Sequence, residues 1–225
     1  MANKKVFYIK NDQIFFDIID FKYYNGFSIQ QKQKSILSMH EEINNKYDGE
    51  ILEISSKSNN ELGRKLSAFN LPVEINGIKT KLENLFQSSK VFSNGGPYRD
   101  LLLCSPVKAK KDERLINSGN LIKFTLNNKD YSIEPKTSFY DYIYCVSLFH
   151  QKDLINDLLK YTIFTDIEFN HLKSINCQAQ SAAIFVLLYK KGILKKAMTD
   201  FDFFKSYVYN ELIAKWGVIW MNFTN

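Results

Sequence analysis

Residues 82–92, LENLFQSSKVF, carry side chains whose types and spacing can do chemistry. On a helix with about 3.6 residues per turn, Glu83, Gln87 and Lys90 fall on one flank, at spacings of four and three. The apolar stripe beside them contains Leu82, Leu85, Phe86, Ser89 and Phe92. The spacing predicts a carboxylate, an amide and an ammonium at the edge of a buried face, where desolvation shifts pKa values. The alternative is a solvated polar stripe on an ordinary amphipathic helix.

The flanking sequence predicts how this segment is held. Asn76-Gly77 separates two short β-type runs, which predicts a hairpin that leads directly into the helix. Residues 93–97, SNGGP, are expected to end the helix, because two glycines and a proline cannot extend it. Ser105-Pro106 predicts the capped start of a further helix over residues 107–117.

The rest of the chain predicts an α+β fold, mainly α, with two or three small β elements. Ser28 is expected to cap a helix that runs to about Tyr47 and ends by Gly49, and Asn127-Asn128 to turn a second hairpin. Residues 1–50 are expected to pack as strands and a helix on a core formed by residues 51–225. Strands are expected at 6–10, 14–24, 50–54, 121–126 and 131–133, and helices at 139–149, 153–161, 177–191 and 201–223.

Composition limits the classes of protein that fit. The chain has 225 residues, 45% of them hydrophobic, which suits one compact domain. Its net charge of +6 is spread evenly, and so permits an anionic ligand or nucleic acid without requiring one. The sequence shows no signal peptide and no apolar run of membrane-spanning length, which predicts a cytoplasmic protein without a membrane partner. Three separated cysteines and three scattered histidines predict free thiols and no metal site.

Two polar segments are candidates for anion binding. Ser56, Lys57 and Ser58 follow a predicted strand, where hydroxyls, backbone N–H groups and an ammonium can hold an anion. Lys110 and Arg114 belong to a mixed-charge run on a predicted helix. The alternatives are a plain polar loop for the first segment and a solvated helix face for the second.

Three motifs in order, LSAFN, LENLFQSSKVF and SPVKAKKDERL, resemble the NADAR family, which has the YbiA-like fold. Ala68 stands where many members have Asn. The segments GGPY, EPKTSFYDY, FTDIEFN and KSINCQAQSAA are similar to the branch of NADAR antitoxins that act with DarT-type ADP-ribosyltransferase toxins. The positions that match the family pattern are Ser67, Phe69, Gly77, Glu83, Phe86, Gln87, Lys90, Ser105, Pro106, Ala109 and Lys110.

The resemblance implies hydrolysis of the N-glycosidic bond that joins ADP-ribose to the guanine amino group in DNA. The implied partners are ADP-ribosylated DNA and a cognate DarT-type toxin, and no cofactor is implied besides ADP-ribose as product. Glu83 is the expected carboxylate at C1″, where it stabilises positive charge or transfers protons. Lys90 has three open roles: to hold Glu83 ionised, to contact a phosphate, or to attack an opened ribose as an amine.

The remaining predicted contacts divide by chemistry. Lysines, Arg114 and the loop serines suit the diphosphate. Phe69 and Tyr140 can stack on a base, with core packing as the alternative. Asp166 and Glu168 lie at i and i+2 in an expected extended run, so both are expected to point the same way, unless they are only surface acids. Gln178 and Gln180 are interpreted as supporting or helix-end groups. The full substrate-binding set is Ser56, Lys57, Ser58, Ser67, Phe69, Asn70, Gln87, Lys110, Arg114, Tyr140, Asp141, Asp166 and Glu168.

Two other functions remain open at the level of sequence. A small-molecule N-glycosidase would act on ribosyl-phosphate metabolites of the riboflavin pathway, as YbiA-like proteins do. A non-enzymatic antitoxin would neutralise its toxin by stoichiometric contact. Activity on modified DNA or on the small metabolite separates the first from the main hypothesis, and the phenotype of a Glu83 variant separates the second.

Overall fold

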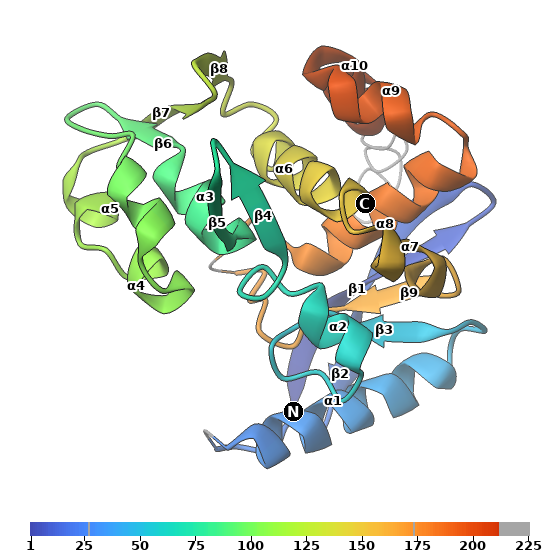
Figure 1. The fold of residues 1–225 in the computed structure, drawn as a ribbon. Coiled ribbons are helices and arrows are strands. Elements are labelled where there is room, and N and C mark those ends of the chain that lie inside the picture. The colour runs from blue at the N-terminus through green and yellow to red at the C-terminus, as the bar shows by residue number, and fades with distance from the viewer. Residues whose placement is uncertain (27, 173, 212–225) are drawn as a thin grey trace, which may run out of the picture.

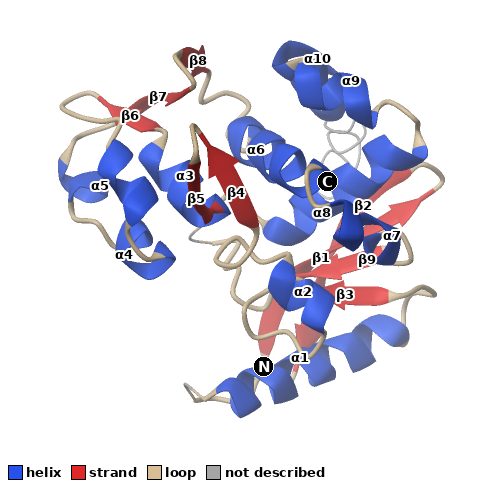
Figure 2. Cartoon of the chain, in the orientation of Figure 1, coloured by secondary structure: helices blue, strands red, loops and turns tan. Residues whose placement is uncertain are grey.

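The computed structural model describes residues 1–26, 28–172 and 174–211, in which short strands and helices are interspersed (Figure 2). The elements are, in order, β1 (Ala2–Lys10), β2 (Gln13–Phe21), α1 (Ile29–Asn44), β3 (Ile51–Glu53), α2 (Glu61–Lys65), β4 (Pro72–Ile75), β5 (Ile78–Lys81), α3 (Leu82–Ser88), β6 (Lys90–Phe92), the 3₁₀ helix η1 (Arg99–Leu103), α4 (Pro106–Lys110), α5 (Arg114–Asn117), β7 (Leu121–Leu126), β8 (Lys129–Tyr131), α6 (Ser138–Phe149), α7 (Lys152–Leu158), β9 (Ile163–Thr165), α8 (Gln178–Lys190), α9 (Leu194–Thr199), α10 (Phe201–Lys205) and the π-helix η2 (Ser206–Asn210).

Four strands form a sheet with the order β2-β1-β9-β3. β1 pairs antiparallel with β2 and β9, whereas β3 and β9 are parallel. Alternate side chains point to opposite faces, so Val6 and Ile163 pack with α1 while Phe7 and Phe164 join the larger core. In Figure 1, α1 runs along one side of this sheet. Because both faces are buried, the strand register is tightly specified.

The opposite face of the sheet is covered by α8, which contacts β1, β2 and β9 and packs along α6 (Figure 1). Small residues at its start, Ala179, Ala182 and Ala183, are fully buried and permit this close approach. A second group of elements, α3 to α5 with the sheet β6-β7-β8, attaches where α3 contacts α6. This mixed α+β single domain confirms the predicted fold class, although the sequence analysis underestimated the sheet.

Turns and caps set by local chemistry are where they were predicted. Asn76-Gly77 joins β4 to β5 and Asn127-Asn128 joins β7 to β8, and all four residues have positive φ. Positive φ at both central positions gives a hairpin turn whose twist matches that of the strands, and Asn and Gly tolerate it best. The Ser28 and Ser105 hydroxyls cap α1 and α4 as predicted.

The predicted helix over residues 82–92 is wrong beyond Ser88. The Ser88 and Ser89 hydroxyls donate to the Leu85 carbonyl at 3.1 and 2.7 Å, which replaces onward helix bonding. The Thr125 N–H donates to the Ser89 carbonyl at 2.7 Å, so the chain turns into strand β6 alongside β7. Lys90 is therefore a strand residue, and residues 93–97 do not end a helix.

Other predicted boundaries are also corrected. The helix over 107–117 is two short helices, because the Asp112 carboxylate accepts the Arg114 N–H at 3.0 Å and turns the chain. The first helix ends at Asn44 and the second strand at Phe21, both earlier than predicted. The sequence analysis missed α2, η1 and α9. Of the C-terminal helix predicted over 201–223, α10 and η2 are described, and residues 212–223 lie outside the described part.

Candidate active site

A cavity of about 1060 Å³ opens between α3, α4, β7, the start of α8 and the loops that follow β3 and β9. Ligand pockets are typically roughly 300–1,000 Å³, so this one is large enough for a dinucleotide-sized ligand. The structure brings together ten of the residues selected from the sequence at its wall. They are Ser56, Lys57, Phe69, Glu83, Gln87, Lys90, Lys110, Tyr140, Asp166 and Glu168.

Helix α3 is the buried element that positions Glu83, and every one of its residues is buried. No side chain caps its N-terminus. Instead, the Glu83 N–H donates to the carbonyl of Ala68, within the LSAFN segment, at 3.0 Å. The Asn84 amide donates to the carbonyls of Leu101 and Cys104 at 2.7 and 2.9 Å. The helix is thus fixed by groups from two distant segments.

Glu83 and Gln87 form a buried pair one turn apart, as their spacing predicted. Each is 6% exposed, so the alternative of a solvated stripe is wrong. The Gln87 amide nitrogen donates to a Glu83 carboxylate oxygen at 2.8 Å, which fixes the amide orientation. The Gln87 amide oxygen is buried at the cavity wall and has no hydrogen-bond partner among the described residues. A buried acceptor of this kind calls for a donor.

Lys90 reaches the same cavity from β6 instead of from the helix. Its ammonium lies 4.6 Å from the centre of the Phe86 ring. Burial is the main cause that lowers the pKa of Lys90 to about 8. The positive charge of Lys110 acts in the same direction, and the charge of Glu83 acts against both. Lys90 therefore gives up its proton more easily than an ordinary lysine.

Asp166 follows β9 and occupies a turn, not the extended run expected from the sequence. One carboxylate oxygen accepts the N–H groups of Glu168 and Phe169 at 3.0 and 3.1 Å, and the other accepts the Gln178 amide at 2.9 Å. Asp166 and Glu168 still share the cavity wall. Burial raises the pKa of Asp166 to about 6, and the Glu168 charge adds to that, while the Gln178 hydrogen bond opposes it.

Gln178 connects the two acidic sites and was not selected as a site residue. Its amide nitrogen holds Asp166, and its amide oxygen accepts the N–H of Ala68, whose carbonyl accepts the N–H of Glu83. A polar residue at the start of an otherwise apolar helix was the available signal. Because this chain of hydrogen bonds is continuous, the position of Asp166 is tied to that of Glu83.

Lysines and one aromatic ring form the rim of the cavity. Lys57, Lys110 and Lys136 line it together with Lys90, and the Lys110 ammonium lies 5.1 Å from the centre of the Phe69 ring. The Ser56 hydroxyl donates to Glu168 at 3.0 Å, which joins the loops after β3 and β9. Tyr140 is 5% exposed and its ring packs edge-on against Phe86, so it forms part of the buried cavity wall.

Five selected residues lie outside the wall of this cavity. Ser58 is fully buried and accepts the N–H of Asn60 at the start of α2. Ser67 and Asn70 both donate to the Arg64 carbonyl at the end of α2, at 2.9 and 2.8 Å. These side chains stabilise the loops on either side of α2 and do not face a ligand.

Arg114 and Asp141 are also engaged elsewhere. Arg114 forms ion pairs with Asp100 and Asp112 and stacks on Tyr98 with its guanidinium carbon 4.4 Å from the ring centre. Asp141 is fully buried in α6, where it accepts the Ser181 hydroxyl at 2.5 Å and the Tyr209 hydroxyl. Both residues stabilise the fold through these contacts, and neither lines this cavity.

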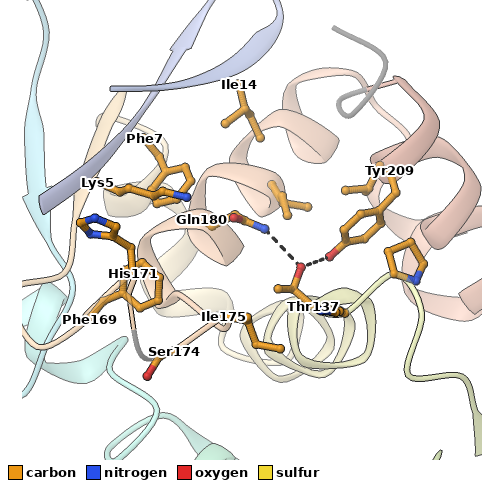
Figure 3. Close-up of a pocket in the computed structure, with 14 residues that line it drawn as sticks. Lys5, Phe7, Ile14, Thr137, Phe169, His171, Ser174, Ile175, Gln180 and Tyr209 are labelled. Atoms are coloured by element: carbon orange, nitrogen blue, oxygen red, sulfur yellow. Dashed lines mark hydrogen bonds between the residues drawn. The ribbon is translucent and has the colours of Figure 1, made fainter. Parts of the chain in front are cut away.

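A second cavity of about 330 Å³ adjoins the first and is shown in Figure 3. The two share the lining residues Lys136, Phe169, Ser174 and Ile175. Its walls are mainly apolar. At one end the Thr137 hydroxyl takes hydrogen bonds with the Gln180 amide at 3.4 Å and the Tyr209 hydroxyl at 2.7 Å (Figure 3).

Within residues 1–26, 28–172 and 174–211, no group of three or more His, Cys, Asp or Glu side chains is placed to hold a metal ion. None of the described helices is both long and apolar enough to cross a membrane. Cys145 and Cys177 are buried and Cys104 is half-buried, all as free thiols.

The α+β fold and its cavity of about 1060 Å³, lined by acids, amides and lysines, define a protein with a polar ligand site. Comparison with protein-family models matches residues 2–216 to the DarT1-associated NADAR antitoxins. The chain belongs to this family, which confirms the resemblance seen in its motifs. No curated protein matches the sequence.

Proposed function

We propose that the protein is a hydrolase that removes ADP-ribose from guanine in DNA and so reverses the modification made by a DarT1-type toxin. The family match supports the antitoxin role. The observation that carries the enzymatic role is the Glu83–Gln87 pair, buried at the wall of a cavity of about 1060 Å³. Burial of an acid in a water-poor cavity is typical of catalytic sites.

The chemistry of the wall suits ADP-ribose. Lys57, Lys110 and Lys136 supply positive charge for a diphosphate. Phe69 presents an aromatic ring at the same rim for stacking on a base. Gln87 and Asn176 also line the wall, and amide side chains are suited to hydrogen bonds with the hydroxyl groups of a ribose.

The proposed mechanism gives Glu83 and Lys90 separate roles. Cleavage of the C1″–N bond builds positive charge at C1″, which the Glu83 carboxylate stabilises from the buried helix face. Lys90, as an ammonium near Glu83, attracts that carboxylate and helps to hold it in place at C1″. Both effects are stronger than in bulk water because the Glu83 side chain is buried.

The direct test uses purified protein and an oligonucleotide that carries ADP-ribose on guanine. Mass spectrometry is expected to detect free ADP-ribose and unmodified DNA. Absence of turnover by folded protein would contradict the proposal. Turnover of a ribosyl-phosphate metabolite in place of modified DNA would instead indicate the small-molecule N-glycosidase.

The relation to the toxin is tested in cells. The wild-type protein is expected to protect against a co-expressed DarT1-type toxin, and the Glu83→Gln variant is expected not to, at equal abundance. Full protection by a folded, inactive variant would identify a stoichiometric, non-enzymatic antitoxin.

A further inference from the structure

Glu53 is a buried carboxylate behind the cavity wall, at the end of β3. It is 2% exposed and lies opposite Thr165 in the β3–β9 pair. One carboxylate oxygen accepts the Thr165 hydroxyl at 2.6 Å and the other accepts the Ile167 N–H at 2.8 Å. Because Thr165 and Ile167 flank Asp166, Glu53 braces the turn that presents Asp166 to the cavity.

We propose that Glu53 is a positioning residue that acts on the substrate through Asp166, by fixing this turn and by placing a second buried carboxyl behind Asp166 that favours the protonated form of Asp166. The inference rests on the proposed hydrolase function. As the C1″–N bond breaks, its electron pair goes to the guanine nitrogen, which takes the proton from Asp166. Water then adds its hydroxyl to C1″, and its remaining proton returns to the pair.

The surroundings of the pair favour retention of that proton. Burial raises the pKa of both carboxyls, that of Glu53 to about 7 with a further contribution from the charge of Asp166, while hydrogen bonds from Ile167, Thr165 and Ser55 oppose the shift of Glu53. Carboxyls whose charges interact in this way titrate as a unit. The other titratable groups that face them are Lys4 from β1, Glu168 from the same turn, Tyr140 and Tyr144 from α6, and Cys177 at the start of α8.

Lys4 is a cation whose charge interacts with both carboxyls of the pair, but Lys4 is itself partly buried. Its ammonium donates to the Phe169 carbonyl. Burial lowers the pKa of Lys4, while the charges of Asp166 and Glu53 oppose that shift. One partly desolvated ammonium faces two buried carboxyl groups, so Lys4 balances at most one of the two charges.

A hydrogen-bond chain allows Glu53 to exist in either protonation state. His40 on α1 places Nε2 3.0 Å from the Thr165 hydroxyl oxygen, and burial lowers the pKa of His40 to about 4, so the ring is neutral near pH 7. With Glu53 ionised, Thr165 donates to Glu53 and His40 donates to Thr165. With Glu53 protonated, each bond reverses direction and the other histidine tautomer accepts. Both states keep the Glu53–Thr165 and Thr165–His40 hydrogen bonds.

The test is Glu53→Gln, which mimics protonated Glu53. The Gln amide oxygen can accept the Ile167 N–H and its amide nitrogen can donate to Thr165, so the turn is retained. Carboxyl carbons labelled with ¹³C are followed by NMR through a pH titration without substrate, with Asp166→Asn for assignment. Wild type is expected to lose two carboxyl protons in coupled steps, the later one above pH 6, and the variant to lack that later step.

Kinetics on modified DNA then show whether the pair acts in the reaction. The alkaline limb of the pH–rate profile is expected to move down by about one pH unit in Glu53→Gln, the scale of interaction within a coupled pair, with KM nearly unchanged. Asp141→Asn, a buried carboxyl outside the cavity, is the matched control and is expected to keep the wild-type limb.

Two results would overturn the inference. One is a wild-type titration in which both carboxyls ionise below pH 5, which is decisive even if the variant does not fold. The other is an unchanged alkaline limb in folded Glu53→Gln. Failure of the proposed function is distinguishable, because the wild-type protein would then not hydrolyse modified DNA at any pH, while the NMR titration would still report the pair.

Discussion

Asp141 and Asp166 are two buried aspartates with opposite surroundings. Asp141 is enclosed by neutral donors, with the Ser181 and Tyr209 hydroxyls and the Gln180 amide all directed at its carboxylate. Asp166 has the cavity on one side and the Glu53 carboxyl behind it. Both have raised pKa values because of burial, so a shifted pKa alone does not mark the functional carboxylate.

The difference lies in what each carboxylate does for its neighbours. Asp141 lies in α6 and its donors come from α8 and η2, so this aspartate joins three elements of the core. The donors to Asp166 come from its own turn and from Gln178, which leaves one side open to a ligand. Removal of the two carboxylates should therefore give opposite patterns of lost stability and lost activity.

The largest contrast is expected between Asp166→Asn and Asp141→Asn. Loss of a general acid typically costs roughly 10²–10⁴-fold in rate, so Asp166→Asn is expected to lower turnover by about that factor with a small change in melting temperature. Asp141→Asn is expected to lower the melting temperature more and to keep the rate per folded molecule within about threefold, because it touches no substrate. Single-turnover rates and melting curves of both variants, at equal folded fraction, are the measurement. An equal loss of rate in the two variants would contradict a catalytic role for Asp166 and a purely structural role for Asp141.

Lys90→Met tests the electrostatic role of Lys90 on the side of the site that faces the cavity. Loss of the ammonium that faces Glu83 is expected to lower turnover by about a hundredfold, the scale of a lost electrostatic group. Borohydride added during turnover is expected to trap no covalent adduct with ADP-ribose. An adduct in wild type that is absent from Lys90→Met would contradict the charge role and identify the amine as a nucleophile.

The pH dependence of the free energy of unfolding tests how much the burial of Glu53 beside Asp166 destabilises the folded protein. The folded state raises the pKa of Glu53 from 4.5 to about 7, so it binds more protons than the unfolded state across that window. The free energy of unfolding therefore falls as pH rises through it, by up to about 3 kcal/mol. Glu53→Gln lacks this term and is expected to gain stability relative to wild type between pH 5 and 8.

His40 acts in the opposite direction but is present in both proteins. Its pKa falls from 6.5 to about 4 on folding, so its contribution increases stability as pH rises through that range. The free energy of unfolding of both proteins is measured with denaturant at several pH values. The His40 contribution cancels when the value for Glu53→Gln is subtracted from that for wild type. A difference independent of pH would show that Glu53 ionises normally.

The smallest effect is expected from chelation. The acids at the main cavity are held by amides, backbone N–H groups and a serine hydroxyl, and no metal-holding cluster exists in the residues described. Hydrolysis is therefore expected to be unchanged in excess EDTA. A loss of rate that Mg²⁺ or Zn²⁺ restores would reveal a metal-dependent step.

Local chemistry explains what the sequence could predict. The Glu83–Gln87 pair follows from one turn of helix, and the Asn-Gly and Asn-Asn hairpins follow from positive φ. Lys90 was placed on the wrong element, because the end of α3 depends on pairing with β7, which is more than thirty residues away. Such non-local pairing overrides helix periodicity.

The roles of the two aspartates could not be predicted for the same reason. The partners of Asp141 come from positions 180, 181 and 209, and Glu53 reaches Asp166 from more than a hundred residues away. Both aspartates stand in aromatic, apolar sequence, so their local patterns look alike. Only the fold shows which of them faces a cavity.

The central claim is that Glu83 stabilises the reacting centre, and Glu83→Gln tests it most directly. The change keeps the shape of the side chain but removes its charge, so turnover is expected to fall by roughly a hundredfold or more. Affinity for ADP-ribose is expected to change much less, because the lysines and Phe69 at the rim remain. Single-turnover rates on guanine-modified DNA, with a melting curve for each protein, give the comparison. A folded variant within about threefold of the wild-type rate would contradict the account.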